Sequence, residues 1–198
     1  MEGSSNHNID VETIRGYFSR YLGRDPYGEI SAADWLTFAE FNLLAVTSGR
    51  VFYDGLDELE SIRRKFHYYP RDIWLYMLAA QWEKIVEEQA FVGRCGYVGD
   101  ELGSRVIAAR QVKNIMHLCF MMECKYAPYS KWFGTAFSRL HCAPKLTPLL
   151  KEVLEANEWK QRQTSLSKAY EVIAQLHNAL SITISLEEKR RSTIIART

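Results

Sequence analysis

A glycine-rich segment between residues 91 and 105 offers the first side chains that could bind a ligand. It reads Phe91-Val-Gly-Arg-Cys-Gly-Tyr-Val-Gly-Asp-Glu-Leu-Gly-Ser-Arg105 and sets Arg94, Asp100, Glu101 and Arg105 among glycines that let a backbone approach a ligand closely. It lacks the Gly-Lys-Ser/Thr ending of a P-loop, and no strand precedes it as in a dinucleotide-binding fold. Two interpretations stay open: a weak phosphate cradle, or a helix-to-helix connection with glycine caps and Asp100 as N-cap.

A second cluster follows Pro128, where Tyr129, Lys131 and Trp132 bring a hydroxyl, a cation and an aromatic face to one turn. Lysine attracts phosphate as a point charge and aromatic rings stack on bases, so this cluster suits a phosphate or a nucleobase. The alternative is that the two aromatic residues anchor the core while Lys131 points to solvent.

A third pattern places Arg110, Asn114 and His117 at i, i+4 and i+7, on one face of an expected helix. It resembles the Arg-spacer-His arrangement of helical RNA-cleaving domains, in which arginine stabilises phosphate charge and histidine moves a proton. A solvated helical face is the alternative. His177 lies on an apolar stripe and is interpreted as a histidine of the core or its edge, with a catalytic role as the alternative.

The cysteines favour a structural role. Cys95, Cys119, Cys124 and Cys142 form no C-x-x-C pair, so in a reducing compartment they are expected to be buried as small apolar residues. A zinc site formed by three of them with His141 lacks the usual knuckle spacing. We therefore expect no metal site.

Charge and hydropathy restrict the partners. The 198 residues carry 25 Lys and Arg against 24 Asp and Glu, so no overall field attracts nucleic acid or an anionic membrane. No run approaches the roughly 20 apolar residues that span a bilayer, and the N-terminus lacks the features of a signal peptide. We expect a cytoplasmic protein with neither a membrane nor a DNA partner.

Periodicity predicts the elements that must position these side chains. Apolar residues recur at helical spacing along most of the chain, which predicts a mainly α fold: a bundle of about seven helices with at most one short strand near residues 50–53. That strand would be Val51-Phe-Tyr53, before the turn Asp54-Gly55. The expected helices cover about 9–22, 31–47, 57–68, 71–90, 100–125, 132–140, 146–156 and 159–184.

The order of several motifs resembles a known family. Between about Ile9 and Ile184 the chain is similar to the C-terminal portion of uncharacterised prokaryotic proteins built on a nucleotidyltransferase fold, a family described only as a domain of unknown function. The resemblance rests on Asp34-Trp-Leu36, Val51-Phe-Tyr-Asp54, Tyr69-Pro70 with Trp74-Leu-Tyr76, Gln81-Trp82, Phe91-Val-Gly-Arg94, Gly99-Asp-Glu-Leu-Gly-Ser104, Pro128-Tyr-Ser-Lys-Trp-Phe-Gly-Thr-Ala-Phe137 and His177-Asn178.

Composition and the resemblance together predict a domain organisation. Residues 1–8 are polar and small and are expected to be disordered, and the charged and polar residues 187–198 are expected to fray. The resemblance implies that residues 9–56 would resemble the tail of a nucleotidyltransferase domain and that residues 57–186 would form the helical domain. The helical domain of such proteins is expected to hold the acceptor substrate. By motif match, the residues expected to contact it are Arg94, Asp100, Glu101, Arg105, Tyr129, Lys131 and Trp132.

The resemblance also implies a catalytic domain that carries a Gly-Ser motif and paired aspartates, which hold Mg²⁺ and a nucleoside triphosphate. This chain offers only Gly49 with Asp54 and Asp57, and an Asp-x-x-Asp spacing places the two carboxylates on opposite faces of a strand. We therefore expect no cofactor bound by this chain alone, with Mg²⁺ and nucleotide supplied only through a separate domain.

These observations lead to one main hypothesis and two alternatives. The chain is expected to be an accessory or acceptor-binding helical module of a nucleotidyltransferase-like protein, inactive alone, as a split partner or a truncated remnant. That hypothesis predicts an exposed apolar patch near Val51 to Tyr53, where a nucleotidyltransferase domain would dock. The alternatives are a ribonuclease that uses Arg110 and His117, and a noncatalytic interaction protein.

Overall fold

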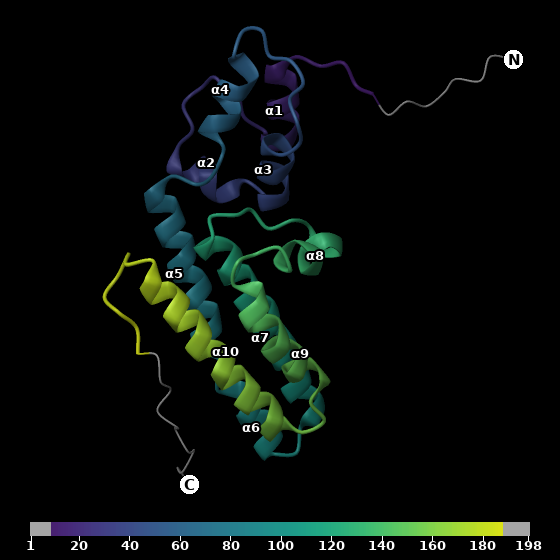
Figure 1. Ribbon diagram of the computed structural model, residues 1–198, viewed down its shortest axis with the longest axis vertical. Helices are drawn as coiled ribbons and strands as arrows, with labels where there is room; N and C mark the ends of the chain where they lie inside the picture. Colours follow the sequence, from purple (N-terminus) through teal and green to yellow (C-terminus); the bar gives the residue numbers. More distant parts are fainter. Residues whose placement is uncertain (1–8, 188–198) are drawn as a thin grey trace, which may run out of the picture. The chain divides into compact units, whose positions relative to one another are not determined.

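The computed structural model describes residues 9–187, which are helices joined by turns and loops, with no strand in that range (Figure 1). The mainly α class is confirmed. The predicted disorder of residues 1–8 and fraying of the C-terminal end fall outside the described residues, apart from residue 187. The chain divides into an N-terminal unit that ends at Tyr69 and a C-terminal unit that begins at Pro70, whereas the sequence suggested a boundary between residues 56 and 57.

The N-terminal unit consists of α1 (Ile14–Leu22), α2 (Ala32–Thr37), α3 (Glu40–Thr47) and α4 (Glu58–Lys65). Its core is aromatic: the ring of Phe66 lies 5.6 Å from that of Phe18 and 5.5 Å from that of Trp35, centroid to centroid. Aromatic pairs at such separations add to the stabilisation from burial.

The helix expected over residues 31–47 is two helices. Its start was predicted correctly, because Ser31 and Asp34 form a reciprocal capping box. The break comes at Phe38 and Ala39, whose backbones are extended. Phe38 is buried against Trp35 and Phe66, so core packing overrides the helical pattern here.

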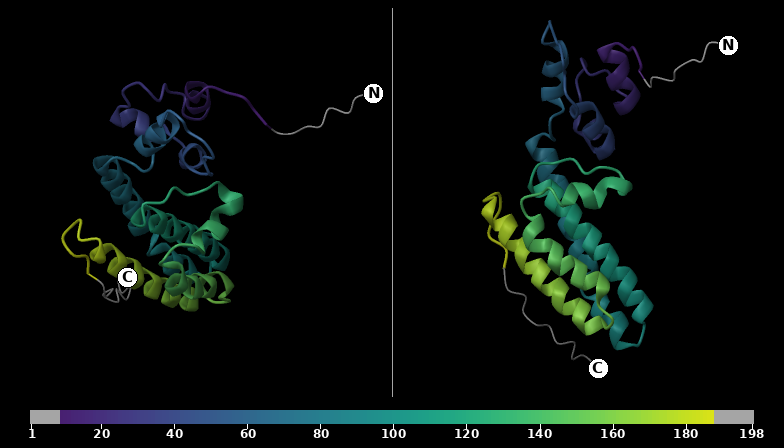
Figure 2. Two further views of the ribbon diagram at one scale, coloured as in Figure 1. Left: turned by 45° about the horizontal axis from the view of Figure 1, so that its top comes forward. Right: turned by 45° about the vertical axis from the view of Figure 1, so that its right-hand side comes forward.

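The C-terminal unit is a bundle built around one long helix. It consists of α5 (Arg71–Glu88), α6 (Phe91–Tyr97), α7 (Glu101–Met122), the 3₁₀ turn η1 (Ser130–Trp132), α8 (Phe133–Phe137), α9 (Ala143–Glu155) and α10 (Trp159–Ala179). Helix α7 packs against α5, α6, α9 and α10, and Figures 1 and 2 show α7, α9 and α10 running side by side. The core between these helices includes Leu78, Ile85, Val112, Ile115, Leu118, Leu146, Leu166 and Ile173.

Three details differ from the sequence expectation. Residues 91–97 form helix α6 rather than a loop, and residues 9–187 contain more separate helices than the expected number of about seven. The last helix ends at Ala179 instead of residue 184, because the chain turns back: Ser181 has a positive φ, and Asn178 hydrogen-bonds both the N–H and the C=O of Leu186. No helix within residues 9–187 is long and apolar enough to cross a membrane.

Candidate functional site

The glycines of the segment 91–105 serve helix packing. Helix α6 lies against the start of α10, and a Cβ added at Gly96 would be 2.0 Å from Cγ of Trp159. At Gly93 an added Cβ would be 3.0 Å from Oε1 of Gln163. The absence of side chains at these two positions lets α6 and α10 approach closely, which favours the helix-connection interpretation over the phosphate cradle.

Asp100 and Glu101 are engaged in holding helices together. Asp100 is the N-cap of α7 and accepts a hydrogen bond of 2.7 Å from the N–H of Gly103. Glu101 accepts a hydrogen bond from Arg162 and another, of 3.2 Å, from the N–H of Trp159. The hydrogen bond and charge of Arg162 lower the pKa of the Glu101 carboxyl.

Arg162 is the buried centre of that contact. It is 1% exposed, and it donates to the carbonyl of Ala156 at 2.9 Å and to the hydroxyl of Ser104 at 3.2 and 3.3 Å. Together with the bond to Glu101, these contacts give every nitrogen of the guanidinium group an acceptor. The cluster therefore fastens the start of α10 to the start of α7, and this is a structural role.

The two arginines predicted to bind substrate at this end are exposed. Arg94 lies over the ring of Phe91, 5.5 Å from its centroid, and Arg105 donates to the carbonyl of Asn157 at 3.2 Å. Neither makes an ion pair within residues 9–187. Both guanidinium groups are exposed and can meet an anion at the surface.

Tyr129, Lys131 and Trp132 lie near the other end of the bundle. Phe133, next in the chain, packs on Phe120 of α7 with ring centroids 5.3 Å apart, whereas Glu101 begins α7. At a rise of about 1.5 Å per residue these two positions of α7 are roughly 28 Å apart. The seven predicted substrate-binding residues thus fall into two groups rather than one site.

Within the second group, the aromatic residues do not anchor the core. Tyr129 and Trp132 are 51% and 49% exposed, and the Lys131 ammonium lies 5.1 Å from the centroid of the Trp132 ring. Lys131 makes no ion pair with any residue from 9 to 187. This surface cluster keeps the combination of cation and aromatic face that suits a flat or anionic ligand.

Arg110 and His117 bind neighbours on α5. Arg110 makes a 2.7 Å ion pair with Glu88, and His117 Nδ1 lies 3.2 Å from Oε1 of Gln81, which is buried. Gln81 in turn donates to the carbonyl of Asn114 at 3.0 Å. The face predicted for a ribonuclease therefore contributes to the packing of α5 on α7.

His177 is buried and fully hydrogen-bonded, as the sequence suggested for a core histidine. Its Nδ1 accepts a 3.1 Å hydrogen bond from the indole N–H of Trp82, and its Nε2 lies 2.8 Å from Oγ1 of Thr183. Thr183 donates onward to the carbonyl of Ile184, so Nε2 carries the proton of a neutral imidazole. Burial lowers the pKa of His177, which agrees with the neutral form.

All four thiols are free, and Cys119 and Cys142 are buried. A hydrogen bond with Cys142 and burial raise the pKa of Cys119 well above its usual range. Glu123 accepts hydrogen bonds of 2.9 Å from the N–H groups of His141 and Cys142, and so caps the start of α9. Within residues 9–187, no three His, Cys, Asp or Glu side chains are grouped closely enough to hold a metal ion.

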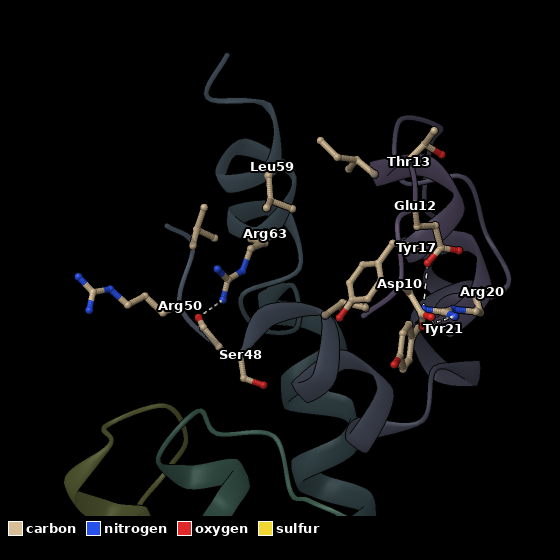
Figure 3. Close-up of a pocket in the computed structure, with 14 residues that line it drawn as sticks. Asp10, Glu12, Thr13, Tyr17, Arg20, Tyr21, Ser48, Arg50, Leu59 and Arg63 are labelled. Carbon is tan, nitrogen blue, oxygen red and sulfur yellow. Dashed lines mark hydrogen bonds and ion pairs between the residues drawn. The ribbon is translucent and has the colours of Figure 1, made fainter. Parts of the chain in front are cut away.

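The N-terminal unit contains an open cleft of about 490 Å³ that the sequence analysis missed. Figure 3 shows Thr13, Tyr17 and Tyr21 on one wall, from α1 and its start, and Leu59 and Arg63 from α4 on the other. Ser48 and the loop that follows α3 also line the cleft, between these two walls (Figure 3). Tyr17 and Tyr21 follow one face of α1, a signal visible in the sequence, but the opposite wall comes from distant residues.

Three arginines line this cleft, and two of them are already paired. Arg20 bonds Glu12 at 2.9 Å and Asp10 at 3.6 Å, and its guanidinium lies 5.4 Å from the Tyr21 ring centroid. Arg63 bonds Glu60 at 2.9 Å and also donates to the carbonyls of Thr47 and Gly49, which satisfies the C-terminal end of α3.

Arg50 is the third arginine of the cleft, and it lies over the Phe52 ring without an ion pair to any described residue. Burial raises the pKa of Tyr17, whose hydroxyl donates to the carbonyl of Ala45 at 3.3 Å. The cleft can bind a ligand or a partner segment, but its lining residues include no pair of nucleophile and base.

Beside the cleft, the loop from Arg50 to Leu56 exposes large apolar side chains. Phe52, Tyr53 and Leu56 are 87%, 89% and 85% exposed, whereas Val51 is partly buried and lines the cleft. Both ends of the loop are held: Arg63 binds the carbonyl of Gly49, and the Asp54 carboxylate accepts from the N–H groups of Glu58 and Glu60. We call Arg50–Leu56 the apolar loop.

Comparison with known families identifies one match. Residues 35–133, half of the chain, match the family described as Domain of unknown function (DUF4037). The chain belongs to this family. The matched DUF4037 region runs from α2 through the apolar loop to α8. No protein of curated function and no solved structure matched the chain.

Proposed function

We propose that this DUF4037 protein is an accessory module of a nucleotidyltransferase-like protein, and that it docks a separate nucleotidyltransferase domain through the apolar loop. The observation that carries the proposal is the near-complete exposure of three large apolar side chains in that loop, Phe52, Tyr53 and Leu56. Exposed apolar groups that lie together are typical of surfaces that bind another protein.

Two further observations support a docking role. The apolar loop is fastened at both ends, so it presents its side chains from a fixed base. Phe52 and Tyr53 also lie within the segment Val51-Phe-Tyr-Asp54 that resembles nucleotidyltransferase-fold proteins, and all three exposed residues lie within the range that matches DUF4037. In this proposal Mg²⁺ and the nucleotide are bound by the partner domain.

The surface cluster of Tyr129, Lys131 and Trp132 is the part of the C-terminal unit that we assign to acceptor contact. It is exposed and combines a cation with an aromatic face. Arg94 and Arg105, at the opposite end of α7, would contact a different part of a large acceptor. Asp100 and Glu101 would act indirectly, by holding α7 and α10 in place. The free thiols support a reducing compartment such as the cytoplasm.

A quantitative pull-down tests the proposal. The tagged wild-type chain is returned to a lysate of its native cells, and co-purifying proteins are identified by mass spectrometry. We expect a protein with a Gly-Ser motif followed by paired aspartates. Its recovery should fall at least about tenfold with Phe52→Ser, Tyr53→Ser and Leu56→Ser combined, which corresponds to about 1.4 kcal/mol of lost binding free energy.

A matched control removes exposed apolar groups elsewhere. Tyr76 and Val86 on α5 are 64% and 56% exposed, and the double variant Tyr76→Ser, Val86→Ser should leave recovery unchanged. If no protein with the paired-aspartate motif is recovered, or if both variants reduce recovery equally, the proposed docking role is wrong.

A further inference from the structure

Charge is distributed unevenly along the C-terminal unit. Between residues 102 and 151 the chain carries eight Lys and Arg against a single acid, Glu123, although the chain as a whole is nearly neutral. The Glu123 carboxylate is itself engaged by the N–H groups of His141 and Cys142. A local excess of cations attracts a polyanion to one surface even where the net charge of the protein does not.

Most of these cations have no partner of opposite charge. Arg110 is the exception, because it pairs with Glu88 on α5. The others are exposed and make no ion pair with any residue from 9 to 187: Arg105, Lys113, Lys125, Lys131, Arg139, Lys145 and Lys151. Since their charge is not neutralised within the described part of the chain, it is available to phosphate groups.

Three of the free cations follow one side of helix α7. Arg105 and Lys113 lie on the same exposed side of the helix, and Lys113 is two turns before Phe120 on that side. The ring of Phe120 carries that of Phe133, which comes two residues after Lys131. At a rise of about 1.5 Å per residue, the line from Arg105 to Phe120 is roughly 22 Å long. It therefore connects the two groups of predicted substrate-binding residues.

This side of α7 presents no carboxylate. The helix has one acidic residue, Glu101, and that carboxylate is bound to the buried Arg162. The exposed residues between Arg105 and Lys113 on the same side, Val106 and Ala109, are small or apolar. A phosphate backbone laid along the helix would thus meet cations without meeting a negative charge.

Aromatic rings are exposed where this line ends. Trp132 and Tyr129 are about half exposed, and the Lys131 ammonium lies 5.1 Å from the centroid of the Trp132 ring. An exposed ring beside a cation can stack on a base while the cation meets the adjoining phosphate. We call Arg105, Lys113, Lys131 and Trp132 the basic strip.

We propose that the basic strip binds a single-stranded nucleic acid, with its cations on the phosphates and Trp132 stacked on a base. A single strand is favoured over a duplex because only unpaired bases offer a face to an aromatic ring. The inference names the chemical class of the acceptor, and in that respect it rests on the proposed function. The binding itself belongs to this chain alone.

Fluorescence anisotropy with the purified full chain tests the proposal. The probe is a fluorescein-labelled single-stranded RNA of about 15 nucleotides, and the comparison is the same sequence as a duplex. We expect the single strand to bind at least about tenfold more tightly than the duplex, because the duplex cannot stack on Trp132. The affinity should fall as salt rises, since each phosphate contact releases counterions from the strand.

Two matched double variants show whether the basic strip carries the binding. Lys113→Gln with Lys131→Gln should raise the Kd about tenfold and reduce the slope of log affinity against log salt by about 1.4, at about 0.7 for each lost phosphate contact. Lys160→Gln with Lys168→Gln removes the same charge from α10, where Lys160 also lies over a tryptophan ring. This control should change the Kd by less than about twofold.

Trp132 separates stacking from charge. Trp132→Leu should weaken binding of the single strand about tenfold and leave the salt slope unchanged, because stacking releases no counterions. Trp132→Phe keeps an aromatic face and should retain most of the affinity. Thermal melting followed by circular dichroism checks that each variant is folded.

The outcomes separate this inference from the proposed function. Absence of salt-dependent binding of the single strand, equal effects of the two double variants, or unchanged affinity with Trp132→Leu would overturn it. Binding to phosphatidylserine vesicles without binding to RNA would assign the basic strip to a membrane surface and overturn it as well. RNA binding without recovery of a paired-aspartate protein would contradict the proposed function alone, and the reverse result would contradict this inference alone.

Discussion

At the scale of single residues, most of the side chains that the sequence suggested for ligand binding or catalysis instead make contacts that hold the fold together. Glu101, Asp100 and His117 each have hydrogen-bond partners on neighbouring elements. Composition cannot distinguish a carboxylate that binds substrate from one that binds a buried arginine, because the partner, Arg162, is about 60 residues away. The glycines of the segment 91–105 were equally ambiguous, because the sequence could not distinguish a ligand-binding loop from close packing of helices.

Gly96 provides the first prediction at this scale. Gly96→Ala should lower the free energy of unfolding by about 1–3 kcal/mol, because its methyl group would collide with the fixed base of the Trp159 side chain. Gly134→Ala is the control: no atom lies within 4 Å of its added Cβ, and alanine should stabilise α8 slightly. Urea unfolding measures both, and equal effects would contradict the packing role of Gly96.

His177 provides a pH prediction. Burial lowers its pKa, so the folded protein favours the neutral imidazole, and protonation would place a proton on Nδ1 against the Trp82 N–H donor. The stabilisation is complete above the unfolded-state pKa, about 6.5, and is lost as the pH falls below it. His177→Gln should remove this part of the pH dependence. An unchanged slope between pH 7.5 and 5.5 would contradict it.

At the scale of elements, most helices could be predicted and most of their irregularities could not. The capping box at Ser31 and the N-cap at Asp100 are local signals, and both are present. The break at Phe38 and the early end of α10 depend on contacts with distant residues. The expected strand at Val51 had suitable residues but has no partner strand within residues 9–187.

The candidate site illustrates the same limit. An exposed apolar patch near Val51 to Tyr53 was expected from the docking hypothesis that the resemblance suggested, and Phe52 and Tyr53 are exposed there. The cleft beside them was not, because its walls combine residues 10–21 with residues 46–63. Similarly, spacing alone could not show that α7 separates Arg105 from Lys131.

Arg162 provides a prediction for the contact between α7 and α10. Arg162→Met should lower the stability of the C-terminal unit by about 2–4 kcal/mol, because it removes the hydrogen bonds that Arg162 donates to Ser104, to the Ala156 carbonyl and to Glu101. Glu101→Gln retains an acceptor for Arg162 and should cost less. Thermal unfolding followed by circular dichroism measures the two, and the reverse order would contradict the role assigned to Arg162.

At the scale of the whole molecule, the chain consists of two compact units with different roles in this account. The N-terminal unit carries the cleft and the apolar loop. The C-terminal unit has its own extensive core, formed entirely from residues after Pro70. The proposed docking surface and the proposed acceptor surface therefore belong to separate units.

This division predicts that the C-terminal unit folds alone. A fragment of residues 70–198 should unfold cooperatively in urea and give a helical circular dichroism spectrum, since its core residues all lie within it. The fragment should also fail to recover the partner, because it lacks the apolar loop. A fragment that folds and still recovers the partner would place the docking surface in the C-terminal unit.

Hydrogen exchange of the intact chain, alone and in complex with the protein recovered in the pull-down, tests the central claim most directly. In the free chain the amides of residues 50–53 make no hydrogen bond to any of residues 9–187 and should exchange fast. In the complex we predict strong protection of the apolar loop, with little change on the exposed face of α5. A stable complex that leaves the apolar loop unprotected would contradict the account.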